Sequence, residues 1–104
     1  MAQLFRLNEK WPYPLTPSEY VRRQFHVSFQ DDPVAIACRH ITGLSTIVWG
    51  NDYPHAEGTF RGSRQLMEKL FADVPAEERD AMVGGTLGGL LGFDAPVVAA
   101  APPA

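Results

Sequence analysis

Residues 45–50, with the sequence STIVWG, constrain the fold more than any other part of the chain. The segment is rich in β-branched residues and lacks the alternation of polar and apolar side chains that marks a half-exposed strand. We therefore expect a strand that is buried on both faces, which is typical of parallel sheets covered by helices.

The remaining pattern predicts one more strand and several helices. Residues 24–29 alternate, with Phe25, Val27 and Phe29 on one face, and form the second expected strand. Helices are expected over 16–23, 33–41, 64–72 and from 73 through Met82, and their expected N-cap residues include Thr16, Asp32 and Ser63. Strands that alternate with helices predict βαβ units and a parallel sheet, but two parallel strands are too few to bury what these elements expose.

The C-terminal part is rich in glycine and alanine. Residues 84–93, with the sequence GGTLGGLLGF, contain five glycines, and each weakens a helix by about 1 kcal/mol relative to alanine. We therefore expect the last helix to end near Met82. Residues 95–104 consist almost wholly of Ala, Pro and Val and are expected to be a disordered tail.

Composition argues against several classes of protein. The formal net charge is −3, and the Arg22-Arg23 pair is too small a basic patch for a nucleic-acid surface. The single cysteine, Cys38, cannot form an internal disulfide and is expected to be a buried structural thiol. There is no signal-peptide pattern and no apolar run of the ~20 residues that a membrane helix needs, so we expect a cytoplasmic protein with neither nucleic-acid nor membrane partners.

The most specific pattern is VWGNDYPH at residues 48–55. It resembles the W-G-S-D-Y-P-H signature that ends the eighth strand in the amidohydrolase-related family, which contains metal-dependent hydrolases and decarboxylases on a TIM barrel. Other short stretches follow in the family's order, among them PSEY at 17–20, FQDDP at 29–33, EGTF at 57–60 and FADVP at 71–75. Several motifs in the right order are more specific than any one of them.

This resemblance implies the fold class. Residues 1–94 would be the C-terminal part of an α/β amidohydrolase-related domain, namely the last two βα units of a TIM (β/α)8 barrel plus a C-terminal helix. Residues 25–29 would be strand seven and residues 47–50 strand eight. A complete barrel needs about 250 residues, so strands one to six would be encoded elsewhere.

The resemblance also implies a mechanism for the intact enzyme. A divalent metal, commonly zinc, would bind a water molecule and lower its pKa toward ~7. Asp52, at the end of strand eight, would take the proton from that water and return it to the leaving group, and it is also a candidate metal ligand. His55 and His26 are candidate residues of the substrate pocket.

Plainer interpretations of these residues remain open. Asp52 fits a simple turn, because Asn and Asp favour turns. His55 could be a loop histidine bonded to backbone, and His26 a structural histidine whose polar groups are satisfied. His40 is expected on a helix surface, and Trp49 in core packing.

The sequence departs from the family in two places. It contains no His-x-His pair, and Thr86, Leu87 and Gly89 replace the asparagine, alanine and arginine of a C-terminal family motif. A catalytic zinc needs three protein ligands, so this chain alone is expected to hold no metal and to be inactive or nearly so.

Three hypotheses follow. In the first, the chain is a fragment of a metal-dependent hydrolase: a truncated gene, a partial reading frame, or one part of a split enzyme completed by a chain that carries strands one to six. In the second, it is an inactive remnant or small α/β module that binds a partner. In the third, it is a small metal protein that uses Asp52 and His55. The substrate, the choice between hydrolysis and decarboxylation, and the oligomeric state are not encoded in a recognisable pattern.

Overall fold

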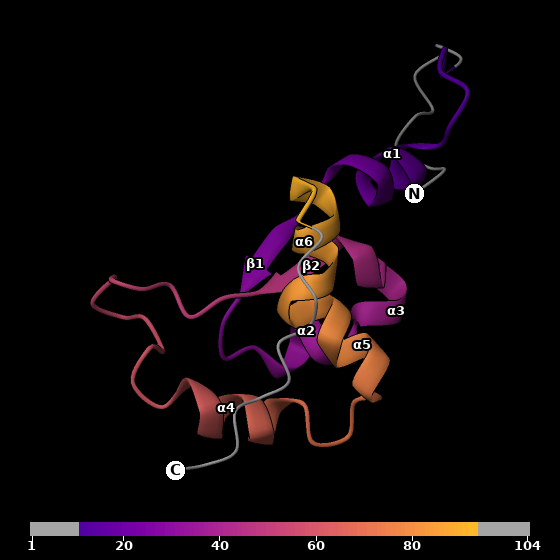
Figure 1. Cartoon of the computed structure of the whole chain (residues 1–104). Coiled ribbons are helices and arrows are strands. Elements are labelled where there is room, and N and C mark those ends of the chain that lie inside the picture. The colour runs from indigo at the N-terminus through magenta and orange to yellow at the C-terminus, as the bar shows by residue number, and fades with distance from the viewer. Residues whose placement is uncertain (1–10, 94–104) are drawn as a thin grey trace.

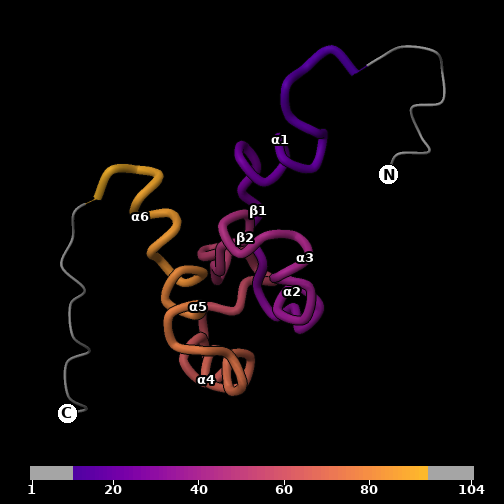
Figure 2. The backbone as a smooth tube through the Cα atoms, turned by 90° about the vertical axis from the view of Figure 1, so that its right-hand side faces the viewer, coloured from indigo at the N-terminus to yellow at the C-terminus, as the bar shows by residue number. Residues whose placement is uncertain are grey.

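A two-stranded parallel sheet lies at the centre of the chain in the computed structural model, which describes residues 11–93. Strands β1 (Val27–Phe29) and β2 (Ile47–Trp49) pair with Phe29 opposite Trp49. Figure 2 shows the sheet between the α5–α6 side and the α2–α3 side of the molecule. The helices are α1 (Pro17–Gln24), α2 (Pro33–Ala37), α3 (Arg39–Thr42), α4 (Ser63–Leu70), α5 (Ala76–Asp80) and α6 (Thr86–Leu91), with a 3₁₀ turn η1 (Leu44–Thr46) and a π-helical segment η2 (Ala81–Gly85).

Helix α1 begins as its sequence predicts. The Thr16 hydroxyl accepts a hydrogen bond from the Glu19 backbone N–H, and the Glu19 carboxylate accepts one from the Thr16 N–H at 2.7 Å. This reciprocal capping box satisfies two backbone donors at the helix start, and Pro17 occupies the first turn. The helix projects from the body of the molecule, at the top of Figure 1.

The predicted helix over 33–41 is interrupted. The Asp32 carboxylate caps α2 as expected, accepting from the N–H groups of Val34 and Ala35. Cys38, with φ −92° and ψ 1°, separates α2 from α3, and it is half-buried rather than fully buried. Gly43 ends α3 with a positive φ of 108°, a conformation that favours glycine.

The last helix is longer than predicted. Segments α5, η2 and α6 run on from one another, because the junction residues Ala81 and Thr86 keep right-handed helical angles. The helix ends at Gly92, whose φ is 72°; the Phe93 N–H bonds to the Gly88 carbonyl and the Gly92 N–H to the Gly89 carbonyl. This is a Schellman ending, so the helix continues through four glycines and ends at Gly92, although it was expected to stop at Met82.

The core is small. Its buried apolar side chains are Phe29, Ile36, Ile47, Phe71 and Met82, which come from both strands, α2, the end of α4 and η2. The Phe29 and Phe71 ring centroids lie 6.4 Å apart. Trp49 packs against this cluster at its edge, as expected for a core tryptophan.

The partial-barrel prediction is wrong. The described chain is 53% helical, and its two strands form one open parallel sheet in which neither strand has a second neighbour among residues 11–93. After β2 the chain forms α4, α5, η2 and α6 in succession, with no further strand there up to residue 93. The parallel pairing was expected from the apolar strand, but the repeating barrel units came only from the resemblance, and these three-residue strands do not build them.

Two other expectations concern the C-terminal tail and membrane-spanning helices. The predicted disordered tail, residues 95–104, lies outside the described residues. Between residues 11 and 93, no helix has the length and apolar character needed to cross a bilayer.

Candidate functional site

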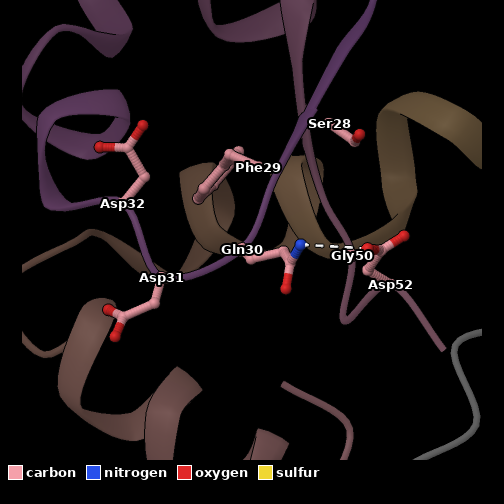
Figure 3. A pocket seen from close by; sticks show the side chains of 7 residues that line it. All are labelled: Ser28, Phe29, Gln30, Asp31, Asp32, Gly50 and Asp52. Atoms are coloured by element: carbon pink, nitrogen blue, oxygen red, sulfur yellow. Dashed lines mark hydrogen bonds between the residues drawn. The ribbon is translucent and has the colours of Figure 1, made fainter. Parts of the chain in front are cut away.

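A cavity of about 390 Å³ lies at the carboxyl-terminal edge of the sheet. Parallel strands end at the same edge, and in open α/β sheets this is where ligands bind. Figure 3 shows the residues that line it: Ser28, Phe29, Gln30, Asp31, Asp32, Gly50 and Asp52. Three of them are carboxylates and none is basic, so the cavity is electronegative.

Asp52 stands in the loop that leaves β2, at this edge. Its φ of 57° is left-handed, and it is the only non-glycine residue of the described chain with positive φ. Asp tolerates this conformation better than most residues, but such backbone angles are uncommon and cluster at functional sites. Its side chain is 52% exposed, so the carboxylate is within reach of solvent and of a ligand.

Gln30 is the closest polar neighbour of Asp52 from another element. Because Phe29 pairs with Trp49, the strand register carries Gln30 to the level of Gly50. The Gln30 side-chain amide donates to Asp52 Oδ2 over 3.4 Å, a long hydrogen bond that Figure 3 marks with a dashed line. The Gln30 backbone carbonyl in turn accepts from the Trp49 indole N–H at 3.2 Å, which fixes the residue against β2.

His55 also meets Asp52, and its Nδ1 atom has two neighbours with opposite demands. Nδ1 lies 3.5 Å from Asp52 Oδ2, and it accepts a hydrogen bond from the Glu57 N–H at 3.3 Å. A neutral imidazole with its lone pair on Nδ1 satisfies Glu57, whereas a protonated imidazole can donate to Asp52. His55 is therefore bonded to the loop backbone and lies beside Asp52, but it is not among the residues that line the cavity.

Gln30 and His55 both contact the Oδ2 atom of Asp52. Among residues 11–93 no donor meets Oδ1 of that carboxylate, so one oxygen remains available to a water molecule or a substrate. Asp32, another carboxylate of the cavity, has a different role. Asp32 points toward α2, whose N-terminus it caps, whereas Gln30 and Asp52 point toward each other (Figure 3).

The other candidate histidines lie elsewhere. His26 precedes β1, at the amino-terminal end of the sheet, and the structure does not bring it together with Asp52. Its Nδ1 atom is buried without a hydrogen-bond partner in the described chain, so the expectation of a satisfied structural histidine is not met. His40 is exposed on α3, as expected, with its Nε2 atom 3.3 Å from Glu78.

Three residues that hold the Asp52 loop were not predicted as site residues. Gln30 was noted only within the FQDDP motif, Asn51 only as part of the turn, and Ser63 was expected to cap α4. Gly62 takes the cap position instead, and the Ser63 hydroxyl donates to backbone carbonyls of the preceding loop. The register of two parallel strands could have placed Gln30 near Asp52; no pattern in the sequence marks the other two.

The side chains around Asp52 do not fit a resident zinc ion. Between residues 11 and 93, no group of three or more His, Cys, Asp and Glu side chains is arranged to hold a metal. Asp52 and His55 together provide two donors, fewer than the three protein ligands of a catalytic zinc site.

Comparison with known proteins adds no relative. No family model matches the chain, and no curated protein is significantly similar to it.

Proposed function

We propose that this chain supplies the acid/base residue of a hydrolase of the amidohydrolase-related kind, with Asp52 as that residue. The observation that supports the proposal is the meeting of Asp52, Gln30 and His55 at the carboxyl-terminal edge of a parallel sheet, beside a cavity. The order of short motifs from PSEY at 17–20 to FADVP at 71–75 supports the same family.

The chemistry follows from the two oxygens of the carboxylate. Oδ2 receives the Gln30 amide and faces His55, which orients the group, while Oδ1 is left for a water molecule. Asp52 would take a proton from that water as it attacks the substrate and would return it to the leaving group. Gln30 would orient the carboxylate by donating a hydrogen bond to its Oδ2 atom.

The remaining parts of such a site would come from another polypeptide segment. The described residues do not form a metal centre by themselves. The histidine ligands of the zinc in the proposed family enzyme would therefore come from outside residues 11–93, and Asp52 is the candidate ligand that this chain would add. The partners would then be a small-molecule substrate and a complementing chain, and the cytoplasm is the compartment we propose. Non-oxidative decarboxylation, with Asp52 again as the acid/base residue, is the alternative chemistry.

The test uses the longest natural polypeptide that contains this sequence. Its hydrolysis of a panel of amides, esters and carboxylated aromatics is measured for the wild type, Asp52→Asn and Asp73→Asn. Loss of a general acid/base lowers kcat about 100-fold or more, so we expect that loss in Asp52→Asn alone. Asp73 is an exposed aspartate outside the cavity and serves as the matched control. Equal activity of the Asp52→Asn variant and the wild type would refute the proposal.

A second candidate function is favoured by the exposed apolar surface. Phe25 and Val27, at the start of β1, are 58% and 57% exposed, and several side chains of α6 are exposed as well. Isolated apolar side chains are ordinary on a protein surface, but a group beside an unpaired strand edge fits a small α/β module that binds another polypeptide. A natural polypeptide without hydrolytic activity that forms a stable complex through β1 would favour this function over the enzyme.

A further inference from the structure

The loop backbone that carries Asp52 is tied together by the residue before it, Asn51. Asn51 takes part in three hydrogen bonds. Its side-chain carbonyl accepts from the Tyr53 N–H at 3.2 Å, its backbone carbonyl accepts from the Thr59 N–H at 2.9 Å, and its side-chain amide donates to the Ser63 hydroxyl at 3.3 Å.

The first of these bonds spans Asp52 directly. A side-chain oxygen of Asn that accepts the N–H two residues later forms an Asx turn, a substitute for a backbone turn. Here the bond links the residues before and after Asp52, and the backbone of Asp52 between them has its left-handed φ of 57°. The Asn51 side chain therefore favours the backbone angles that aim the Asp52 carboxylate at Gln30.

The other two bonds anchor the far side of the loop. The Ser63 hydroxyl accepts from Asn51 and donates to the Thr59 carbonyl at 2.9 Å, so the start of α4 and the loop are joined through one residue. The chain is also close-packed inside this turn. A Cβ added at Gly58 would lie 2.8 Å from the backbone carbonyl oxygens of both Asn51 and Asp52, so only glycine fits there without a shift.

The geometry points to Asn51 as a positioning residue for Asp52. It touches neither the cavity nor Gln30; it acts by holding the backbone from which the acid/base carboxylate projects and by tying that backbone to α4. The inference rests on the proposed role of Asp52, but its structural part can be tested without any catalytic activity.

The structural test compares amide hydrogen exchange in wild type, Asn51→Ala and Asn51→Asp. Asn51→Ala removes both side-chain bonds, so Tyr53 should lose about tenfold or more of its exchange protection. The Gly50 amide, which bonds to the Phe29 carbonyl in the sheet, should keep its protection. Asn51→Asp retains an oxygen for the Tyr53 N–H and should restore its protection, which a general loss of stability would not allow.

A spectroscopic signal reports on Asp52 itself. The carboxyl ¹³C resonance of Asp52 should move in Asn51→Ala to the position that it has in Gln30→Ala, because both variants separate the two side chains. In Asn51→Asp it should return toward the wild-type position. An Asp52 resonance and a Tyr53 exchange rate that do not change in Asn51→Ala would overturn the inference, whatever the function of the chain.

The kinetic test uses the natural polypeptide in which Asp52 has been shown to act. Asn51→Ala should lower kcat about tenfold with little change in KM, because it misplaces an acid/base group without touching the substrate. Asn51→Asp should recover part of that loss. Full activity of Asn51→Ala beside a defective Asp52→Asn would refute the positioning role alone, whereas full activity of both variants would refute the proposed function.

Discussion

Replacement of Met82 by alanine is the most direct test of how this small fold is held together. Met82 is the largest fully buried side chain of the described chain, with 0% of its surface exposed. It lies in η2, which contacts β2, so its removal opens a cavity between the long C-terminal helix and the sheet. Truncation of a buried methionine to alanine costs about 2–5 kcal/mol.

That loss is large for this chain. Domains of ordinary size have an unfolding free energy of about 5–15 kcal/mol, and a core of five buried apolar side chains places this one near the lower limit. A loss of about 3 kcal/mol would then leave about 2 kcal/mol and lower the ratio of folded to unfolded molecules by more than about a hundredfold.

The measurement is urea unfolding followed by far-UV circular dichroism, with the dependence on urea compared between variants. Leu90→Ala is the matched control, because Leu90 lies on the same helix but is 57% exposed. We expect a loss of less than about 0.5 kcal/mol for this surface change. Similar losses in the two variants, or a loss below about 1 kcal/mol for Met82→Ala, would show that the helix does not pack on the sheet through Met82.

Three further outcomes follow from individual contacts. The pKa of Glu19 is lowered from its ordinary value of 4.5, chiefly by the hydrogen bond from the Thr16 hydroxyl and then by that from the Thr16 N–H. Because the pKa is lower in the folded state, the ionised carboxylate stabilises α1 above pH 4.5. This stabilisation is lost as the pH falls through the lowered pKa. In an NMR titration the midpoint of Glu19 should rise toward 4.5 in Thr16→Ala, and an unchanged midpoint would contradict the capping box. Gly58→Ala should cost about 1–3 kcal/mol in urea unfolding because its Cβ would meet backbone oxygens, whereas Gly50→Ala, with nothing within 4 Å of its Cβ, should cost less; equal losses would count against the close approach at Gly58. The Arg39 and Glu78 side chains are only 17% and 22% exposed and bond at 2.6 Å, so a double-mutant cycle between them should give a coupling free energy above about 1 kcal/mol. The exposed Arg79–Asp80 pair should give about 0–0.5 kcal/mol. The reverse order of the two coupling energies would refute burial as the cause of the stronger coupling.

Local signals in the sequence predicted the starts of α1 and α2, but not that of α4, where Gly62 takes the cap position expected of Ser63. Thr16 and Asp32 cap helices as their residue types and the following prolines indicate, and Gly43 ends one. These are short-range effects, in which one side chain satisfies backbone groups a few residues away. The parallel pairing of the two strands was also expected, because an apolar strand without alternation must be covered on both faces.

The errors arose where more distant contacts decide. The helix from Ala76 to Leu91 contains four glycines but keeps its course, because η2 packs on β2 and tertiary packing outweighs helix propensity. The prediction of a partial barrel was wrong for a different reason. The repeating barrel units were implied by a resemblance alone, whereas the described chain contributes two strands of three residues.

The candidate site was predicted in part. Asp52 and His55 were chosen from one motif and do lie together. Gln30 and Asn51 could not be chosen in this way, since one depends on the register between strands separated by some twenty residues of sequence and the other on a side chain that folds back on its own loop. The motif predicts Asp52 as the candidate acid/base residue, whereas the residues that contact and hold its loop become visible only in three dimensions.

Within residues 11–93 both outer edges of the sheet are unpaired, and this carries a practical consequence. The Phe29 carbonyl is turned toward β2, and since the peptide groups of successive residues in a strand point to opposite sides, those of Ser28 are turned outward. The outward N–H and C=O of Ser28, beside the exposed Val27, are groups to which a second molecule can add its own strand. Self-association during purification should therefore increase with protein concentration, and dilute samples are the ones in which the monomer can be studied.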